Sequence, residues 1–348
     1  MTRRAQLVGT GLIGGSIGLA LRTAGWHVTG SDRNGASAAR ALELGAIDAV
    51  GDDADAELTF VATPVGTVAD VARGRLGVVT DVGSVKASIV AAVANPQFVG
   101  GHPMAGSEQE GVDGSRADLF QGAVWVLTPV ATTDHAAHAL VRSVVSSFGA
   151  EVVELPPERH DALVAVVSHV PHLTAASLMR LAAERSEEHA ALLRLAAGGF
   201  RDMTRIAAGH PGIWPDICIE NQGAITEVLD LLIGELTAMR HRVETADRAG
   251  LLDALSRARS ARLNLPGRVA ATAEVAEVRV PVPDRPGVLA EITTLASELG
   301  VNIHDLEIAH SSEGDAGVLL LLVDATLVER FIGGLVARTY KATARSLE

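Results

Sequence analysis

The chain has 348 residues, of which 48% are hydrophobic and 35 are glycine, a composition typical of packed α/β and helical domains. Its net charge of −13 argues against a general nucleic-acid binder, which needs a basic face. The single cysteine, Cys218, excludes an internal disulfide framework and fits a reducing compartment. We see neither a signal peptide nor an apolar stretch of membrane-spanning length, so we expect a cytoplasmic protein without a membrane partner.

The first motif is glycine-rich and lies between a short apolar strand, residues 5–8, and a helical stretch. Gly9, Gly11 and Gly14 form the pattern GxGxxG, which permits a tight turn, close approach of a pyrophosphate and packing of helix on strand. Asp32 follows about 20 residues later, where a carboxylate accepts a hydrogen bond from the ribose 2′-hydroxyl of NAD. The alternative is a loop aspartate beside a glycine turn. The residues predicted to contact NAD are Gly9, Gly11, Leu12, Ile13, Gly14, Asp32, Arg33, Thr63 and Pro64.

Strand and helix patterns then alternate to about residue 155, which predicts a mainly parallel sheet covered on both faces. Two polar residues follow apolar strands in this region: Ser84 in DVGSVK and His102 in GHPMAG. Side chains at these strand ends line the crevice where open α/β sheets bind ligands. We therefore expect Ser84 and His102 to face one cofactor, the alternative being a turn serine and a surface histidine.

Residues 158–262 have helical periodicity, and the last long helix is apolar on several faces. Such a helix must be buried, either within its own chain or against a second subunit, so we expect a helical dimerisation domain. His169 and His172 are three residues apart and share a helix face. Their spacing allows a metal site, but no acidic or thiol ligand is obvious nearby, and we favour hydrogen bonding to a substrate. Arg205 predicts a cationic pocket for a carboxylate, or else a surface ion pair with Asp202.

Taken together and in order, GTGLIGGSIG, DVGSVK, GHPMAGSE, SHVPH, GGFRDMTRIA and WPDI resemble the prephenate/arogenate dehydrogenase family of tyrosine biosynthesis. The resemblance implies a Rossmann domain and a helical domain that builds a homodimer. It implies NAD-dependent oxidative decarboxylation of prephenate to 4-hydroxyphenylpyruvate, or of arogenate to tyrosine. A non-catalytic NAD-linked sensor is the alternative from a different class.

The resemblance also assigns roles to individual residues. It implies that His102 accepts the proton of the ring hydroxyl, that Ser84 orients His102 and the nicotinamide, and that no metal takes part. The substrate-binding residues that it implies are Arg205, His169, His172, Ser107 and Glu108.

The last part of the chain changes character, and residues 275–348 predict a βαββα pattern. With DRPGVLAEI and GVNIHDLEI, this part resembles the ACT domain, a small amino-acid-sensing module. The resemblance implies an aromatic amino-acid effector, tyrosine by feedback logic, near Gly287 and Asn302. The alternative is a module that only oligomerises. The predicted domains are residues 1–155 for NAD, 156–265 for substrate and dimerisation, a linker over 266–274, and 275–348 for regulation.

Overall fold

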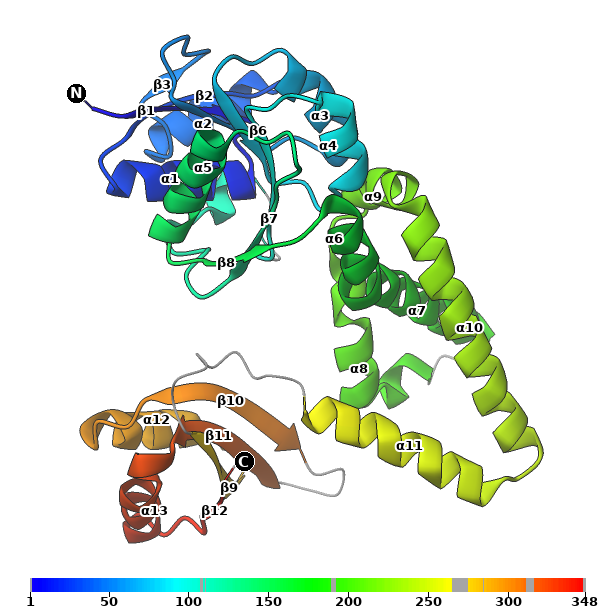
Figure 1. The fold of residues 1–348 in the computed structure, drawn as a ribbon. Coiled ribbons are helices and arrows are strands. Elements are labelled where there is room, and N and C mark those ends of the chain that lie inside the picture. The colour runs from blue at the N-terminus through cyan, green and yellow to red at the C-terminus, as the bar shows by residue number, and fades with distance from the viewer. Residues whose placement is uncertain are drawn as a thin grey trace. The chain divides into compact units, whose positions relative to one another are not determined.

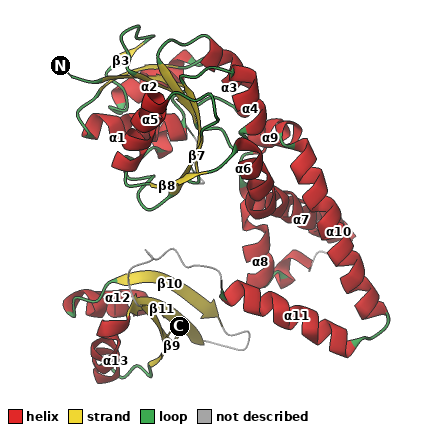
Figure 2. Ribbon diagram, in the orientation of Figure 1, coloured by secondary structure: helices red, strands yellow, loops and turns green. Residues whose placement is uncertain are grey.

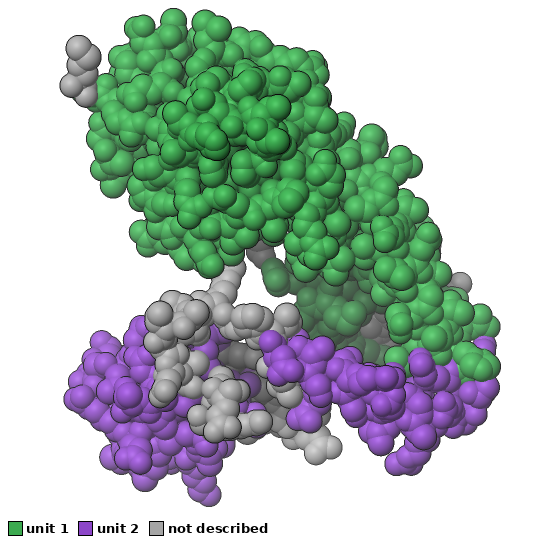
Figure 3. All heavy atoms as spheres, viewed as in Figure 1, with its two compact units in different colours: residues 1–241 green, residues 242–348 purple. Residues whose placement is uncertain are grey.

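The structure is a computed structural model and describes residues 2–106, 109, 111–188, 192–264, 275–283, 285–310 and 316–346. The chain divides into two compact units, residues 1–241 and residues 242–348, which are described one by one (Figure 3). Ser107, Glu108 and the predicted linker over 266–274 lie outside the described residues.

An 8-stranded sheet forms the first part of unit 1, in the order β3-β2-β1-β4-β5-β6-β7-β8 (Figure 1). All of its neighbouring strands are parallel except β6 and β7, which are antiparallel. The strands are β1 (Arg4–Val8), β2 (His27–Ser31), β3 (Ala49–Val50), β4 (Leu58–Val61), β5 (Val78–Asp81), β6 (Phe98–Pro103), β7 (Val124–Thr128) and β8 (Glu151–Glu154). The sequence did not predict β3, because two residues carry no alternation.

Helices cover both faces of this sheet, as its buried strands require. The helices are α1 (Leu12–Thr23), α2 (Gly35–Glu43), α3 (Val65–Arg73), α4 (Ala87–Val93) and α5 (His135–Ser147). Apolar side chains of α1 and α5 share one core cluster with the sheet, while those of α3 and α4 form a second cluster. The parallel strands β1, β4, β5 and β6 therefore end at a common edge, with a helix following each of the first three.

The rest of unit 1 is helical (Figure 2). The helices are α6 (Pro157–Val164), α7 (Val170–Glu188), α8 (Gly198–Thr204), α9 (Trp214–Glu220) and α10 (Gln222–Glu244), with shorter turns at Ala165–His169, Leu192–Leu195, Arg205–Ala208 and Pro211–Ile213. Ala165, Val170 and Ile225 form the buried centre where α7 packs on α10. The α9 helix packs on α3, and α6 packs on α4, so this region contacts the sheet domain directly.

The turn between α6 and α7 is a π-helical turn, Ala165–His169. The amide of Val170 donates to the carbonyl of Ala165, five residues back, and Pro171 has no amide hydrogen to donate to the turn before it. The extra residue in this turn re-aims its side chains, and His169 is only 1% exposed. The sequence predicted a helix here but not this irregularity.

The run Pro157–Arg185 is long and apolar enough, by length and composition alone, to cross a membrane, contrary to the sequence-based expectation. It also carries the buried polar side chains of His160, Asp161 and His169, and its apolar side packs on α10. Buried polar groups are costly in a lipid-facing helix, so length and composition alone are weak evidence that this run crosses a membrane.

Unit 2 contains α11 (Arg248–Leu263) and a 4-stranded antiparallel sheet in the order β10-β11-β9-β12. Its other elements are β9 (Val275–Pro283), α12 (Val288–Glu298), β10 (Ile303–His310), β11 (Ala316–Asp324), α13 (Val328–Ala337) and β12 (Thr343–Ser346). The observed order is thus βαββαβ, and the predicted βαββα pattern lacked the last strand. That strand is a short edge strand without apolar alternation, and it forms by backbone pairing with β9.

Candidate active site

The glycine-rich turn after β1 has the shape that a dinucleotide needs. Gly9 has φ +96°, and a Cβ there would lie 2.3 Å from the carbonyl oxygen of Ala62, so only glycine fits. A Cβ on Gly11 would meet nothing within 4 Å, which leaves the backbone before α1 open to a ligand. No side chain caps the start of α1, whose amide groups favour an anion.

Asp32 lies at the end of β2, beside this turn. Its Oδ2 accepts hydrogen bonds from the amide of Thr10 at 2.8 Å and from the hydroxyl of Thr10 at 3.2 Å, and Oδ1 accepts from the amide of Asn34 at 2.8 Å. These contacts hold the carboxylate at the mouth of the turn, while Arg33 beside it is exposed. After β4, the buried Oγ1 of Thr63 has no hydrogen-bond partner among the described residues. The glycine turn, Asp32 and Thr63 thus follow β1, β2 and β4 at one edge of the sheet, where they would fit NAD, while the contact of each predicted residue with NAD stays a prediction.

His102 lies near the end of β6 and is half-buried, and Ser84 lies in the loop after the neighbouring strand β5. Nδ1 of His102 is 2.8 Å from Nε2 of His160 on α6, and Nδ1 of His160 is 2.7 Å from Oδ1 of Asp161. Burial lowers the pKa of His102 well below its ordinary value, and the neighbouring His160, Lys86 and His169 lower it further. The imidazole of His102 is therefore neutral near pH 7, as a proton acceptor must be.

The carboxylate of Asp161 also joins the helical region to the sheet domain. Its two oxygens accept hydrogen bonds from the amides of Lys86 and Ala87, each at 2.8 Å, at the N-terminus of α4. A carboxylate is favoured there because the free amides of a helix N-terminus carry partial positive charge. The contact fixes α6, and with it His160, against the loop that carries Ser84.

A buried ion pair supports the same loop. The ammonium of Lys86 contacts Oδ2 of Asp81 and donates to the carbonyl of Gly101 at 2.8 Å, and both side chains of the pair are 0% exposed. Burial lowers the pKa of Lys86, and the charge of Asp81 opposes this. Asp81 also accepts from the amides of Gly83 at 2.8 Å and Gly101 at 3.0 Å. The pair thus joins the residues that flank Ser84 to the residue before His102.

His169 reaches the same region from the π-helical turn. Its Nδ1 is 3.2 Å from Nδ2 of Asn221, and its Nε2 is buried without a partner among the described residues. Burial lowers the pKa of His169 to about 4, although Asp161 opposes the shift. The neutral ring is thus available as a hydrogen-bonding group.

His172 stacks on Trp214, with ring centroids 3.6 Å apart and planes 12° apart. Burial lowers the pKa of His172, so this contact joins two neutral rings. The described part of the chain holds no group of three His, Cys, Asp or Glu side chains arranged for a metal ion.

Arg205 begins the turn Arg205–Ala208 and is exposed in the single chain. Its predicted contact with a carboxylate stays a prediction, as do the roles of Ser107 and Glu108.

Sequence reasoning missed four residues of this site: Asp81, Lys86, His160 and Asp161. Asp81 and Lys86 are the first and last residues of the DVGSVK motif, so their spacing around Ser84 could have indicated that they support it. The adjacent His160 and Asp161 near the start of a helix gave no such signal, since their importance comes from contacts with residues far away in sequence.

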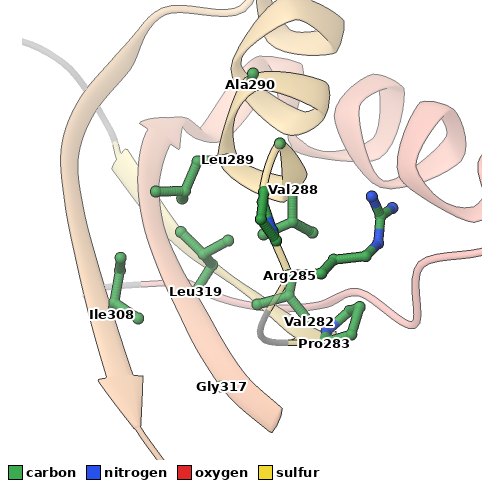
Figure 4. A pocket seen from close by; sticks show the side chains of 11 residues that line it. Val282, Pro283, Arg285, Val288, Leu289, Ala290, Ile308, Gly317 and Leu319 are labelled. Carbon is green, nitrogen blue, oxygen red and sulfur yellow. The ribbon is translucent and has the colours of Figure 1, made fainter. Parts of the chain in front are cut away.

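An apolar pocket lies within unit 2, between the start of α12 and the sheet (Figure 4). Its volume is about 370 Å³, and apolar side chains such as Leu289, Ile308 and Leu319 surround it. Gly287, which has φ +90° at the N-cap of α12, lines this pocket. Asn302 is not among the lining residues and instead contacts His304 at 3.3 Å. The structure therefore brings only the first of the two predicted effector residues to the pocket.

Comparisons with known proteins match most of unit 1 and the first part of unit 2. Residues 17–154 match the model of the prephenate dehydrogenase nucleotide-binding domain, and residues 156–257 match that of the prephenate dehydrogenase dimerization domain. These matches confirm the predicted Rossmann-like domain and the helical domain that follows it. Both matches end before the C-terminal sheet begins at Val275.

Individual relatives agree with the family models. The chain is 36% identical over 333 residues to the prephenate dehydrogenase of Bacillus subtilis, covering 90% of each chain. The prephenate dehydrogenase of A. aeolicus, solved with hydroxyphenyl propionate and NAD⁺, has a TM-score of 0.72 and 31% identity, and the match covers 76% of this chain and 99% of that one. The arogenate dehydrogenase of Synechocystis has a TM-score of 0.65 and 30% identity, with 74% and 98% covered.

Proposed function

The chain belongs to the prephenate dehydrogenase family, and we propose that it converts prephenate to 4-hydroxyphenylpyruvate by NAD-dependent oxidative decarboxylation. The observation that carries this proposal is the position of His102. It lies near the end of β6, at the sheet edge that carries the nucleotide-binding turn, and contacts the helical domain through His160. A neutral, half-buried histidine at that place is suited to accept a proton from a substrate bound between the two domains.

Separate residues bind the cofactor and accept the proton. The open turn of Gly9, Gly11 and Gly14 would hold the pyrophosphate of NAD⁺, and Asp32 would bind the ribose hydroxyl. The bound cofactor would supply the acceptor for the hydride that leaves ring carbon C4. His102 takes the proton of the hydroxyl on that carbon, and loss of CO₂ leaves an aromatic ring, which makes the reaction strongly favourable.

The other site residues position the substrate. His169 offers a buried ring nitrogen from the helical domain, and Ser84 follows β5, the strand that pairs with the strand of His102. Arg205 binds a substrate carboxylate by a charge-assisted hydrogen bond. Holding C4 and the proton acceptor in reactive positions supplies the main part of the catalysis, and no metal is needed.

Arogenate is the alternative substrate, since the Synechocystis structural neighbour is an arogenate dehydrogenase. The two substrates differ at the side chain, which is a keto acid in prephenate and an amino acid in arogenate. Neutral histidines in the pocket favour the keto acid, because an ammonium group is better bound by a carboxylate.

The active form is a homodimer. An apolar groove of about 530 Å³ lies between α7, α8 and α10, and exposed Val166, Met203 and Leu231 line it. Exposed apolar surface of this kind supports burial against a second copy, as does the description of the family model that matches this region. Sedimentation of the purified chain should give the mass of a dimer, and Leu231→Glu should give that of a monomer.

We also propose that the C-terminal part, predicted as residues 275–348, is an ACT-like regulatory module that binds tyrosine. The alternation of strands and helices in this part supports the assignment, as does the apolar pocket at Gly287, although neither family model reaches this region. A free aromatic amino acid is small enough for a pocket of about 370 Å³.

The first experiment is NADH formation by the purified chain with prephenate and with arogenate in parallel. Turnover of prephenate supports the proposal, and turnover of arogenate alone would replace the substrate and the product. His102→Asn should lower kcat by several orders of magnitude while NAD still binds. His135→Asn, an exposed histidine at the start of α5, is the matched control. A chain that binds NAD but turns over neither substrate would instead be a sensor.

A further inference from the structure

We infer that His160, held by Asp161, is a positioning residue that fixes the proton of His102 on Nδ1 and so leaves Nε2 as the proton acceptor. The pair also takes up the positive charge that His102 gains. The first part concerns the resting protein and holds whatever the substrate is; the second part rests on the proposed function.

The argument begins at the carboxylate of Asp161, which can only accept hydrogen bonds. Its Oδ1 lies 2.7 Å from Nδ1 of His160 and also accepts from the amide of Lys86, and its Oδ2 accepts from the amide of Ala87. These contacts fix the orientation of the carboxylate, and an oxygen that only accepts needs a donor at Nδ1 of His160. Nδ1 of His160 therefore carries a hydrogen.

The second step passes from His160 to His102. A neutral imidazole that has its hydrogen on Nδ1 presents an acceptor at Nε2. That Nε2 is 2.8 Å from Nδ1 of His102, so Nδ1 of His102 must donate. The lone pair of His102 then lies on Nε2, the nitrogen that does not face His160.

The third step concerns the charge that follows proton transfer. Among the residues that the structure describes, the titratable groups that face His102 are His160 on α6, Lys86 before α4 and His169 in the π-helical turn, and all three disfavour a cation on His102. When Nε2 of His102 takes a proton, the Nδ1–H bond of His102 can break. That hydrogen then forms a new N–H bond at Nε2 of His160. The cation then lies next to Asp161, whose contact with His160 stabilises it.

The direct test is the tautomer of His102 in the ¹⁵N-histidine-labelled full-length protein, read from long-range ¹⁵N–¹H NMR correlations. His102→Asn identifies the signals that belong to this residue. We expect a protonated Nδ1 and an unprotonated Nε2 at pH 7.5. A protonated Nε2 would overturn the inference even if the protein turns over prephenate, and a protonated Nδ1 would support it even if no turnover is found.

Two variants of His160 and one of Asp161 test the consequence for turnover. The side chain of Gln in His160→Gln keeps an acceptor near the position of Nε2, whereas His160→Leu removes it. His135→Gln is the matched control on the surface. We expect kcat to fall at least 100-fold in the Leu variant and less than 10-fold in the Gln variant, with the KM for NAD⁺ unchanged in both. Equal losses in the two variants would indicate a packing role and overturn the inference.

The third variant, Asp161→Asn, reverses the chain of donors. The amide of the new asparagine can donate a hydrogen bond to Nδ1 of His160, so that His160 carries its hydrogen on Nε2 instead. Nε2 of His160 then donates to Nδ1 of His102, and His102 must hold its own hydrogen on Nε2. We expect the His102 NMR signals to change to that tautomer and kcat to fall at least 100-fold. We also expect the pH profile of kcat/KM to change in this variant. An unchanged tautomer and an unchanged pH profile would overturn the inference.

Discussion

Nδ2 of Asn221 lies 3.2 Å from Nδ1 of His169, and this contact decides which nitrogen of the histidine carries the hydrogen. Nδ2 of the same amide also donates to the carbonyl oxygen of Asp161 at 2.9 Å, which fixes the orientation of the amide. Nδ1 of His169 therefore accepts, and its buried Nε2 carries the hydrogen. In the proposed function, this N–H group is the donor for a substrate oxygen.

Asn221→Asp should therefore weaken substrate binding. A carboxylate in this place would accept a hydrogen from Nδ1 of His169 and turn Nε2 into an acceptor. Because a lost hydrogen bond to a buried group costs about 1–3 kcal/mol, we expect the KM for prephenate to rise roughly 10-fold or more while the KM for NAD⁺ stays unchanged. Steady-state kinetics check this, with Asn95→Asp in the turn before β6 as the control. Equal rises in both Michaelis constants would contradict the assignment.

The same histidine should make the protein less stable in acid. In the folded chain the pKa of His169 is lowered to about 4, whereas in the unfolded chain it is about 6.5. Between these two pH values only the unfolded chain binds the proton. The free energy of unfolding is therefore unaffected by His169 above pH 6.5 and falls as the pH decreases toward 4. The slope is up to about 1.4 kcal/mol per pH unit for one such histidine. Urea unfolding at pH 7 and pH 5 measures it, and His169→Gln should reduce the difference; an unchanged difference would assign it to other groups.

The buried pair of Asp81 and Lys86 should be strongly coupled. Each single change, Asp81→Asn or Lys86→Met, leaves a partner buried without its counter-charge, at a cost of roughly 3–5 kcal/mol of unfolding free energy. The double variant removes both charges, so it should lose less than the sum of the single losses. Denaturant unfolding of the four proteins gives the coupling energy. Losses that simply add would show that the two side chains contribute independently.

The sequence predicted the alternation of strands and helices and the nucleotide-binding edge because both follow from local patterns. GxGxxG must lie between a strand and a helix to work, and alternating apolar runs must form a covered sheet. His160 and Asp161 could not be found in this way, since they act through contacts with His102 and Lys86 from other elements. The π-helical turn that buries His169 and the edge strand β12 likewise depend on tertiary packing and on pairing with β9.

The preference for NAD over NADP should depend on Asp32. Its carboxylate is held by Thr10 and Asn34 at the mouth of the glycine turn, where it would repel a 2′-phosphate. In Asp32→Ser the exposed Arg33 remains to attract that phosphate. We expect the ratio of kcat/KM for NAD⁺ over NADP⁺ to fall by at least about 10-fold, or 1.4 kcal/mol. Glu57→Ser, a surface carboxylate paired with Arg3, is the control. An unchanged ratio would place the ribose elsewhere.

The pocket of unit 2 gives the last prediction, which concerns regulation. Leu289 lies at the start of α12, and its side chain borders the space that tyrosine would occupy (Figure 4). Leu289→Trp adds a bulky ring there, so the variant should lose tyrosine inhibition and tyrosine binding measured by calorimetry. Val336→Trp, on the exposed surface of α13, changes the same unit outside the pocket and should keep both. If wild-type protein and both variants respond to tyrosine equally, the effector does not bind in this pocket. If none responds, tyrosine is not the effector of this unit, which favours the alternative of a module that only oligomerises.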